Sequence, residues 1–160
     1  MDSPSPARLY ASAGGAFLVV LGIVGFFYSA SFGSPGNVGE VLGAFGVNGW
    51  ENFLHIATGA IGLLVAGYAA RRYALCVGAI YLVLAVWGFA LGGGHSVLGL
   101  LPVEPGEDPL HLALGLLGIA AGLATPAGAS ERPQSPGRRD KGRAGGGSQS
   151  LRSPRGVTRS

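Results

Sequence analysis

The sequence predicts an all-α membrane protein: a four-helix transmembrane bundle built from two tandem two-helix repeats and followed by a disordered C-terminal tail. Three observations lead to this prediction. The chain has four long apolar segments, a 23-residue stretch that occurs twice, and a polar, basic end. Charged residues make up only 12% of the chain, which suits a protein that lies mostly in lipid.

The repeated stretch runs from Val41 to Leu63 and returns from Val97 to Ile119. Aligned without a gap, the two copies are identical at ten of 23 positions. Each copy reads as an outer loop that ends in Glu-Asn or Glu-Asp, followed by an apolar helix with a histidine in its first turn. Because each repeat includes two spans, we expect the halves to run in the same direction about a pseudo-twofold axis along the membrane normal.

Residues 1–9 form a polar segment. Residues 10–28 contain no charge, and this uncharged segment is long enough for a first span. A cleaved signal peptide is the alternative, because Arg8 precedes the apolar run and small residues follow it. The run Phe17–Phe26 aligns with Ile80–Phe89 in a later span. A cleaved leader has no reason to resemble a retained helix, so the alignment favours a true span.

The transmembrane domain is predicted over residues 10–127. Its second, third and fourth spans are predicted at residues 52–67, 73–91 and 109–125. Arg71 and Arg72 are expected to form a short basic turn between the second and third spans. Asp108 is expected to cap the fourth helix, with Pro109 at its first position.

The basic residues indicate the orientation. Arg8, Arg71, Arg72 and the tail fall on one side of the predicted membrane, whereas the other two loops contain acidic residues and no Lys or Arg. The positive-inside rule therefore places both termini in the cytoplasm of a bacterium, with the protein in the plasma membrane.

The tail, residues 128–160, has eight of the eleven Lys and Arg residues and little that can be buried. We expect it to be disordered and cytoplasmic. It either contacts anionic lipid headgroups or is a solvated tail without a partner. The pI near 9.4 is thus a property of the tail and does not indicate a nucleic-acid partner.

Small residues recur along each span at alternating steps of three and four, the period of a left-handed bundle. Close backbone approach at small residues drives helix association in lipid better than burial of Leu does. The glycines predicted to pack the helices are Gly22, Gly25, Gly59, Gly62, Gly78, Gly88, Gly115 and Gly118.

A paired polar site is predicted where the second and fourth spans begin. Its candidate residues are His55, His111, Glu51, Glu107, Asn52 and Asp108. The histidines lie on the small-residue stripes, so we expect them to point into the bundle at matching depth. Glu51 and Glu107 each lie four residues before the histidine of their own helix and can face it along that helix.

Four interpretations of this site compete. In the favoured one, each group caps its helix and ties the outer loop to the bundle, without a cofactor. The others are a zinc, iron or manganese site, a haem ligated by both histidines with Gly59 and Gly115 leaving space for the ring, and proton or solute passage. Cys76 is expected to be a small core residue and His95 a loop residue.

The sequence contains no P-loop, dinucleotide fingerprint, nucleophile elbow or CxxC motif. We therefore expect a non-enzymatic structural or interaction module. The alternative is a metal- or haem-binding, redox-associated membrane component that uses His55 and His111.

The run Glu51-Asn-Phe-Leu-His55 with Gly59, followed by Leu110-His111 with Gly115, resembles the four-span actinobacterial membrane proteins grouped as domain-of-unknown-function family 4383. The resemblance covers about residues 8–125 and leaves out the tail. Asp108 stands where an Asn is expected in the second copy, which adds a charge. The resemblance implies an integral membrane protein and supplies no activity. A four-span family of the DoxX type matches the duplicated histidine less well.

Overall fold

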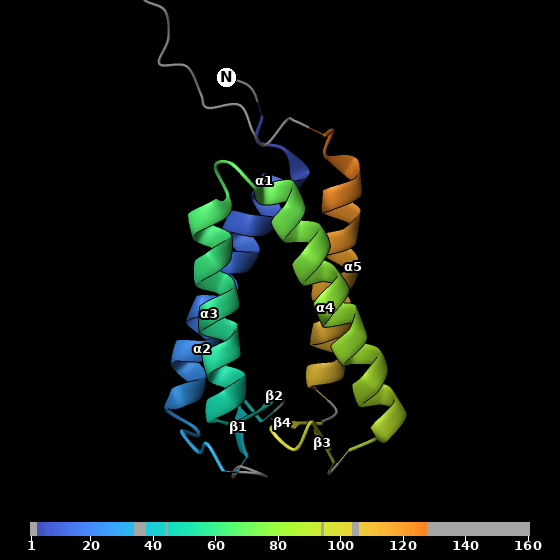
Figure 1. The fold of residues 1–160 in the computed structure, drawn as a ribbon. Helices are drawn as coiled ribbons and strands as arrows, with labels where there is room; N and C mark the ends of the chain where they lie inside the picture. The colour runs from blue at the N-terminus through green and yellow to red at the C-terminus, as the bar shows by residue number, and fades with distance from the viewer. Residues whose placement is uncertain (1–2, 34–37, 44, 94, 104–105, 128–160) are drawn as a thin grey trace, which may run out of the picture.

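The computed structural model describes residues 3–33, 38–43, 45–93, 95–103 and 106–127. Most of these residues are helical, which confirms the prediction of a mostly helical protein. The long helices form two pairs, α2 with α3 and α4 with α5 (Figure 1). The predicted tail lies outside the described residues.

The first helix is continuous from Pro6 to Phe26. It consists of α1 (Pro6–Leu9), a π-helical turn η1 (Tyr10–Gly14) and α2 (Gly15–Phe26). It begins within the segment that the sequence analysis treats as polar, because Ser5 caps it and Pro6 fits its first position. The Ser5 hydroxyl accepts a hydrogen bond from the Arg8 amide at 3.4 Å.

Each predicted outer loop contains a short antiparallel hairpin that the sequence analysis does not predict. Strands β1 (Gly39–Val41) and β2 (Phe45–Val47) form the first, and β3 (Ser96–Val97) and β4 (Leu101–Pro102) form the second. Both hairpins turn through a Leu-Gly pair in the left-handed region. Leu42 and Leu98 each have φ of 55°, which costs a non-glycine residue about 1–2 kcal/mol.

The remaining helices are α3 (Gly49–Val65), α4 (Ala70–Leu91) and α5 (Glu107–Ala124). Two local predictions are wrong. Arg71 and Arg72 lie in the first turn of α4 and not in a turn between helices. Helix α5 already begins at Glu107, with Gly106 at the cap position and no side-chain cap, so Asp108 is a helical residue and not the cap.

Glycines bring the helices of each pair into backbone contact. A Cβ atom on Gly15 of α2 would lie 2.8 Å from the carbonyl oxygen of Gly59 in α3. A Cβ atom on Gly78 of α4 would lie 3.0 Å from the carbonyl oxygen of Gly115 in α5. These positions correspond in the two halves, and all eight glycines predicted to pack the helices are buried.

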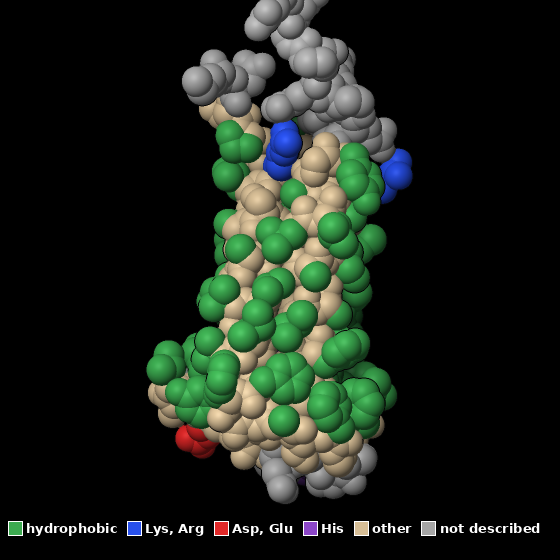
Figure 2. Space-filling model, turned by 90° about the vertical axis from the view of Figure 1, so that its left-hand side faces the viewer, with side chains coloured by type: hydrophobic (Ala, Val, Ile, Leu, Met, Phe, Trp, Pro, Cys, Tyr) green, Lys and Arg blue, Asp and Glu red, His purple; other side chains and the backbone are tan. Residues whose placement is uncertain are grey.

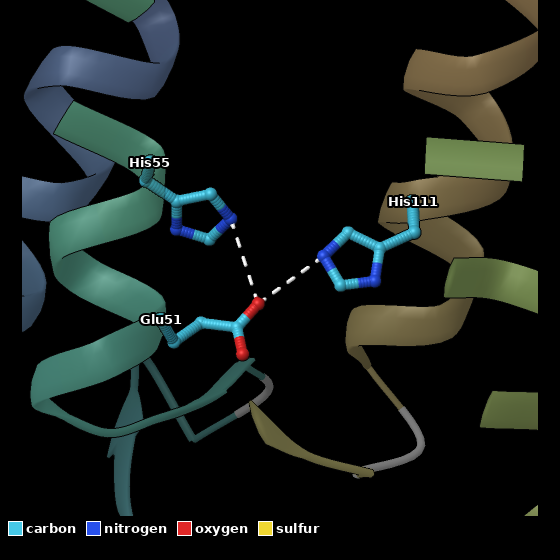
Figure 3. Close-up of side chains that lie close together, drawn as sticks. All are labelled: Glu51, His55 and His111. Atoms are coloured by element: carbon cyan, nitrogen blue, oxygen red, sulfur yellow. Dashed lines mark ion pairs between the residues drawn. The ribbon is translucent and has the colours of Figure 1, made fainter. Parts of the chain in front are cut away.

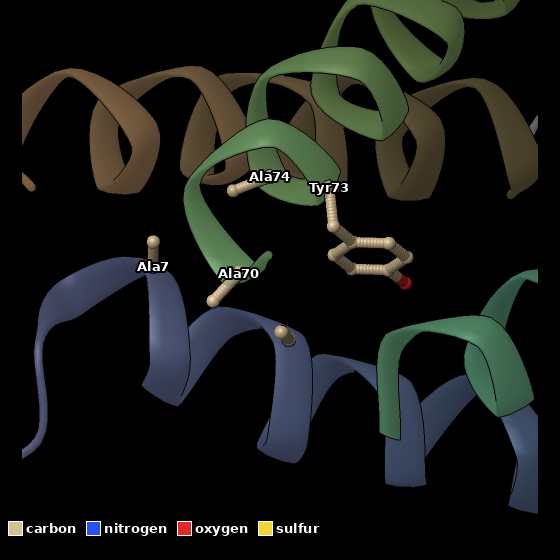
Figure 4. Packing of buried hydrophobic residues seen from close by; sticks show 5 residues of the cluster. Ala7, Ala70, Tyr73 and Ala74 are labelled. Carbon is tan, nitrogen blue, oxygen red and sulfur yellow. The ribbon is translucent and has the colours of Figure 1, made fainter. Parts of the chain in front are cut away.

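At the end opposite the hairpins, small residues and tyrosine hydroxyls join the two pairs. Ala7, Ala11, Ala70 and Ala74 form a cluster of small residues around Tyr73 (Figure 4). Each half then donates one tyrosine hydroxyl to the other half at 3.0 Å: Tyr10 to the Leu114 carbonyl, and Tyr73 to the Thr58 carbonyl. The Ala7 amide also donates to the Thr125 hydroxyl at 2.9 Å, which joins the two ends of the domain.

Two helices, Pro6–Phe26 and Ala70–Leu91, are long and apolar enough to cross a membrane. Only 33% and 28% of their most apolar windows are buried, so they are not ordinary core helices. Among the described residues, α3 and α5 do not meet the same criterion; α3 has only 17 residues, and the polar first turn of α5 lowers its mean hydropathy. Cys76 is exposed on α4, so its predicted core position is wrong.

Candidate functional site

A buried polar centre lies where α3 and α5 begin, next to the hairpins. All six polar residues proposed from the sequence are buried, and none is more than 7% exposed. They are Glu51, Asn52 and His55 of α3, and Glu107, Asp108 and His111 of α5. Burying such groups is costly unless they find partners inside the protein, so their contacts indicate what the centre does.

Glu51 connects the two histidines (Figure 3). Its Oε1 atom lies 3.2 Å from Nε2 of His111 and 3.7 Å from Nε2 of His55. The centroids of the two imidazoles are 6.2 Å apart, with 58° between the ring planes. Helices α3 and α5, which belong to different halves, therefore meet through these three side chains.

Asn48, which is not among the residues predicted for the site, holds Glu51 in place. Its side-chain oxygen caps α3 by accepting a hydrogen bond from the Glu51 amide at 2.9 Å. Its Nδ2 atom donates to the Leu100 carbonyl at 2.6 Å, which links α3 to the second hairpin. The signal was present, because Asn48 followed three residues later by a glutamate is the pattern of a capping box.

Asn52 and Asp108, which correspond in the two repeats, each fill the space beside a glycine of the neighbouring helix. A Cβ atom on Gly25 would lie 2.6 Å from the Asn52 side-chain carbon, and one on Gly88 would lie 2.6 Å from that of Asp108. Asn52 also donates to the Ser29 carbonyl at 2.8 Å. These two glycines therefore make room for polar side chains in addition to packing helices.

The two glutamates of the centre occupy corresponding positions in the repeats, and both are buried. Glu51 of the first repeat approaches the histidines of both repeats. One carboxylate of the first repeat therefore serves the histidines of both repeats.

Tyr81 of α4 is a neighbour of the centre that sequence reasoning misses. Its ring centroid lies 5.2 Å from that of His111, and the residue is 4% exposed. Its place on the small-residue stripe of α4 indicates that it points inward, but gives no reason to pair it with His111. His95 is exposed in the segment between α4 and β3, with Nδ1 3.2 Å from the Gly92 carbonyl oxygen.

Three residues of the centre have the chemistry of a metal site. Glu51, His55 and His111 each offer one ligand atom, and these atoms all lie within 4.8 Å of one another. Two imidazoles and a carboxylate suit zinc, iron or manganese.

The haem interpretation depends on open space beside two glycines. A Cβ atom on Gly59 would lie 2.8 Å from the Val19 amide nitrogen, and one on Gly115 would lie 2.8 Å from that of Leu82. Protein backbone therefore occupies the space in which a porphyrin ring would need to fit. The geometry favours a single ion over haem.

The fold and the polar centre define a small, mostly helical protein with membrane-like helices and a buried Glu-His cluster at one end. Residues 8–124 match the family described as "Domain of unknown function (DUF4383)", and the chain belongs to this family. No curated protein and no solved structure matches the chain.

Proposed function

We propose that the chain is a four-span protein of the bacterial plasma membrane, acting as a non-enzymatic structural or interaction module. Large apolar side chains on all four long helices support the membrane assignment. They include Val20, Ile23, Ile61, Leu64, Val83, Val86, Leu116 and Leu117, each at least 48% exposed. Figure 2 shows such side chains along one whole side of the molecule. In water this surface would promote aggregation, whereas lipid tails match it.

The two shorter helices are compatible with spanning. At a rise of 1.5 Å per residue, α3 with 17 residues is about 26 Å long and α5 with 18 residues about 27 Å. A hydrocarbon core of about 30 Å can thin locally to match such helices at modest cost.

The distribution of charge supports termini inside the cell. Lys and Arg side chains lie at the end of the molecule that carries the chain termini, and an acidic side chain lies at the opposite, hairpin end (Figure 2). Arg71 donates through Nε to the Thr125 carbonyl at 2.9 Å, so it is held at the terminal end. The positive-inside rule then places that end in the cytoplasm and the hairpins outside.

The halves are two tandem repeats related by a pseudo-twofold axis along the membrane normal. The reciprocal tyrosine hydrogen bonds support this arrangement, because Tyr10 corresponds to Tyr73, and Leu114 to Thr58. The matching Leu-Gly turns of the two hairpins support it independently.

A structural role is supported by one observation: the polar residues of the centre join separate parts of the chain. Asn48 ties α3 to the second hairpin, Asn52 ties α3 to the segment after α2, and Glu51 lies between the histidines of both halves. Polar contacts of this kind specify how apolar helices assemble in lipid, where burial of Leu contributes little.

The basic tail, residues 128–160, is proposed to contact anionic headgroups of the inner leaflet, each nearby basic residue contributing about 1 kcal/mol. Sedimentation of a peptide of this sequence with phosphatidylglycerol vesicles tests the contact. Binding should disappear with neutral phosphatidylcholine vesicles. Equal binding to both, or binding to neither, contradicts it.

Reporter fusions test the topology. Fusions of alkaline phosphatase and of green fluorescent protein after Ser34, Arg72, Pro105 and the last residue should report outside, inside, outside and inside. Phosphatase activity at Arg72, or fluorescence at Ser34, would contradict the four-span arrangement.

A further inference from the structure

We infer that Glu51, His55 and His111 bind one divalent first-row transition-metal ion at the hairpin end of the bundle, with zinc(II) as the simplest candidate. The inference goes beyond the structural role proposed above, and it rests on three independent features of the polar centre: the spacing of its donor atoms, its unpartnered buried atoms and its charge.

The donor atoms already have the spacing of a metal site. Zinc is bound at about 2.0–2.2 Å by imidazole nitrogen and carboxylate oxygen, usually in tetrahedral geometry, so two ligand atoms on one ion lie about 3.4 Å apart. Oε1 of Glu51 lies 3.2 Å from Nε2 of His111 and 3.7 Å from Nε2 of His55. Both imidazole nitrogens point toward this oxygen (Figure 3), so small side-chain rotations bring the three atoms around one ion.

Atoms of the same side chains are buried without a hydrogen bond. His55 is 1% exposed, and neither of its ring nitrogens has a hydrogen-bond partner; the same is true of Oε2 of Glu51. Native proteins rarely leave such atoms unsatisfied. A metal ion accounts for Nε2 of His55 directly, because the lone pair of a neutral imidazole is a metal ligand.

The acidic groups of the centre favour a cation. The carboxyl groups of Glu51 and Asp108 are buried within the first turns of α3 and α5. The Lys and Arg side chains among the described residues lie at the opposite end of the molecule (Figure 2). Buried carboxylates are normally paired or bound to metals, and a divalent ion supplies two positive charges where no arginine or lysine is available.

The ligand types select the metal. Magnesium and calcium prefer oxygen ligands, whereas two imidazoles with one carboxylate suit zinc, iron or manganese. Three protein ligands leave a fourth tetrahedral position for a water molecule or another ligand.

Zinc titration of the purified full-length chain tests the inference. The protein is prepared in detergent, its affinity tag is removed, and metal is stripped with EDTA. Calorimetry with zinc chloride, followed by gel filtration and elemental analysis, should give one zinc per chain. Magnesium chloride should give no binding.

Variants locate the site. Losing a group in the outer shell of a metal site typically costs 10–100-fold in affinity, so loss of a ligand should cost at least 10-fold. We expect this loss for Glu51→Gln, His55→Gln and His111→Gln. The matched controls are Glu40→Gln and His95→Gln, which change an exposed carboxylate and a loop histidine at the same end and should bind as the unchanged chain does.

Three outcomes overturn the inference: no zinc in the unchanged chain, zinc retained by all three ligand variants, or an equal loss in the two controls. If a ligand variant fails to fold, Glu51→Asp keeps a carboxylate, and cobalt(II) replaces zinc as an absorbing probe. Intense visible bands of tetrahedral cobalt should appear in the unchanged chain and shift in Glu51→Asp. Identical spectra would also overturn the inference.

Discussion

A methyl group on Gly59 should separate α2 from α3. A Cβ atom there would overlap the Gly15 carbonyl oxygen and lie 2.8 Å from the Val19 amide nitrogen, whereas ordinary contacts begin at 3.4 Å. The second contact alone requires a shift from 2.8 to 3.4 Å, about 0.6 Å, and both neighbours are backbone atoms that cannot rotate away.

The expected magnitude combines two opposing effects. Overpacking costs about 1–3 kcal/mol, and contact with backbone puts this site near the upper end. Alanine is the better helix former by about 1 kcal/mol, so Gly59→Ala should lower the free energy of unfolding by about 1–2 kcal/mol. The control is Gly14→Ala in the first helix, where a Cβ atom meets only the Tyr10 ring at 3.9–4.0 Å. This control should gain up to about 1 kcal/mol.

Unfolding by sodium dodecyl sulfate in mixed micelles, followed by far-ultraviolet circular dichroism, compares the two variants. Gly59→Ala should be less stable than Gly14→Ala by about 1–3 kcal/mol. A Gly59→Ala variant as stable as Gly14→Ala would refute the close helix contact.

Two further substitutions probe the connections between the halves. Asn48→Ala removes the cap of α3 and the bond to Leu100, and should cost about 1–2 kcal/mol in the same unfolding assay; unchanged stability would contradict the role given to Asn48. Tyr73→Phe removes the hydroxyl bond to the Thr58 carbonyl and should cost about 1 kcal/mol. A stabilised Tyr73→Phe variant would show that this hydroxyl does not join the halves.

Much of the helix packing is predictable from the sequence because it depends on periodicity. Steps of three and four residues place small side chains on one face of a helix, and Gly15, Gly59, Gly78 and Gly115 lie at these contacts. Cys76 was expected in the core because lone cysteines are often buried, but it lies off the small-residue stripe of α4 and is exposed.

The hairpins were not predictable in the same way. Their turns need Leu42 and Leu98 in a left-handed conformation that leucine disfavours, so local preference argues against the turn that forms. Asn48, in contrast, carried a recognisable capping pattern.

Membership of the polar centre could be predicted, but its contact between the halves could not. Glu51 precedes His55 by four residues, and nothing in that spacing shows that it also approaches His111. That contact arises where two helices from different halves meet, which local sequence does not specify.

The central claim is that His55 and His111 belong to one shared centre and do not cap two separate helices. A double-mutant cycle of His55→Ala and His111→Ala, measured by unfolding in mixed micelles, tests it most directly. Side chains that share Glu51 should be coupled, so the second substitution should cost less after the first, with a coupling energy of about 0.5–3 kcal/mol. Losses that add to within about 0.3 kcal/mol would contradict a shared centre.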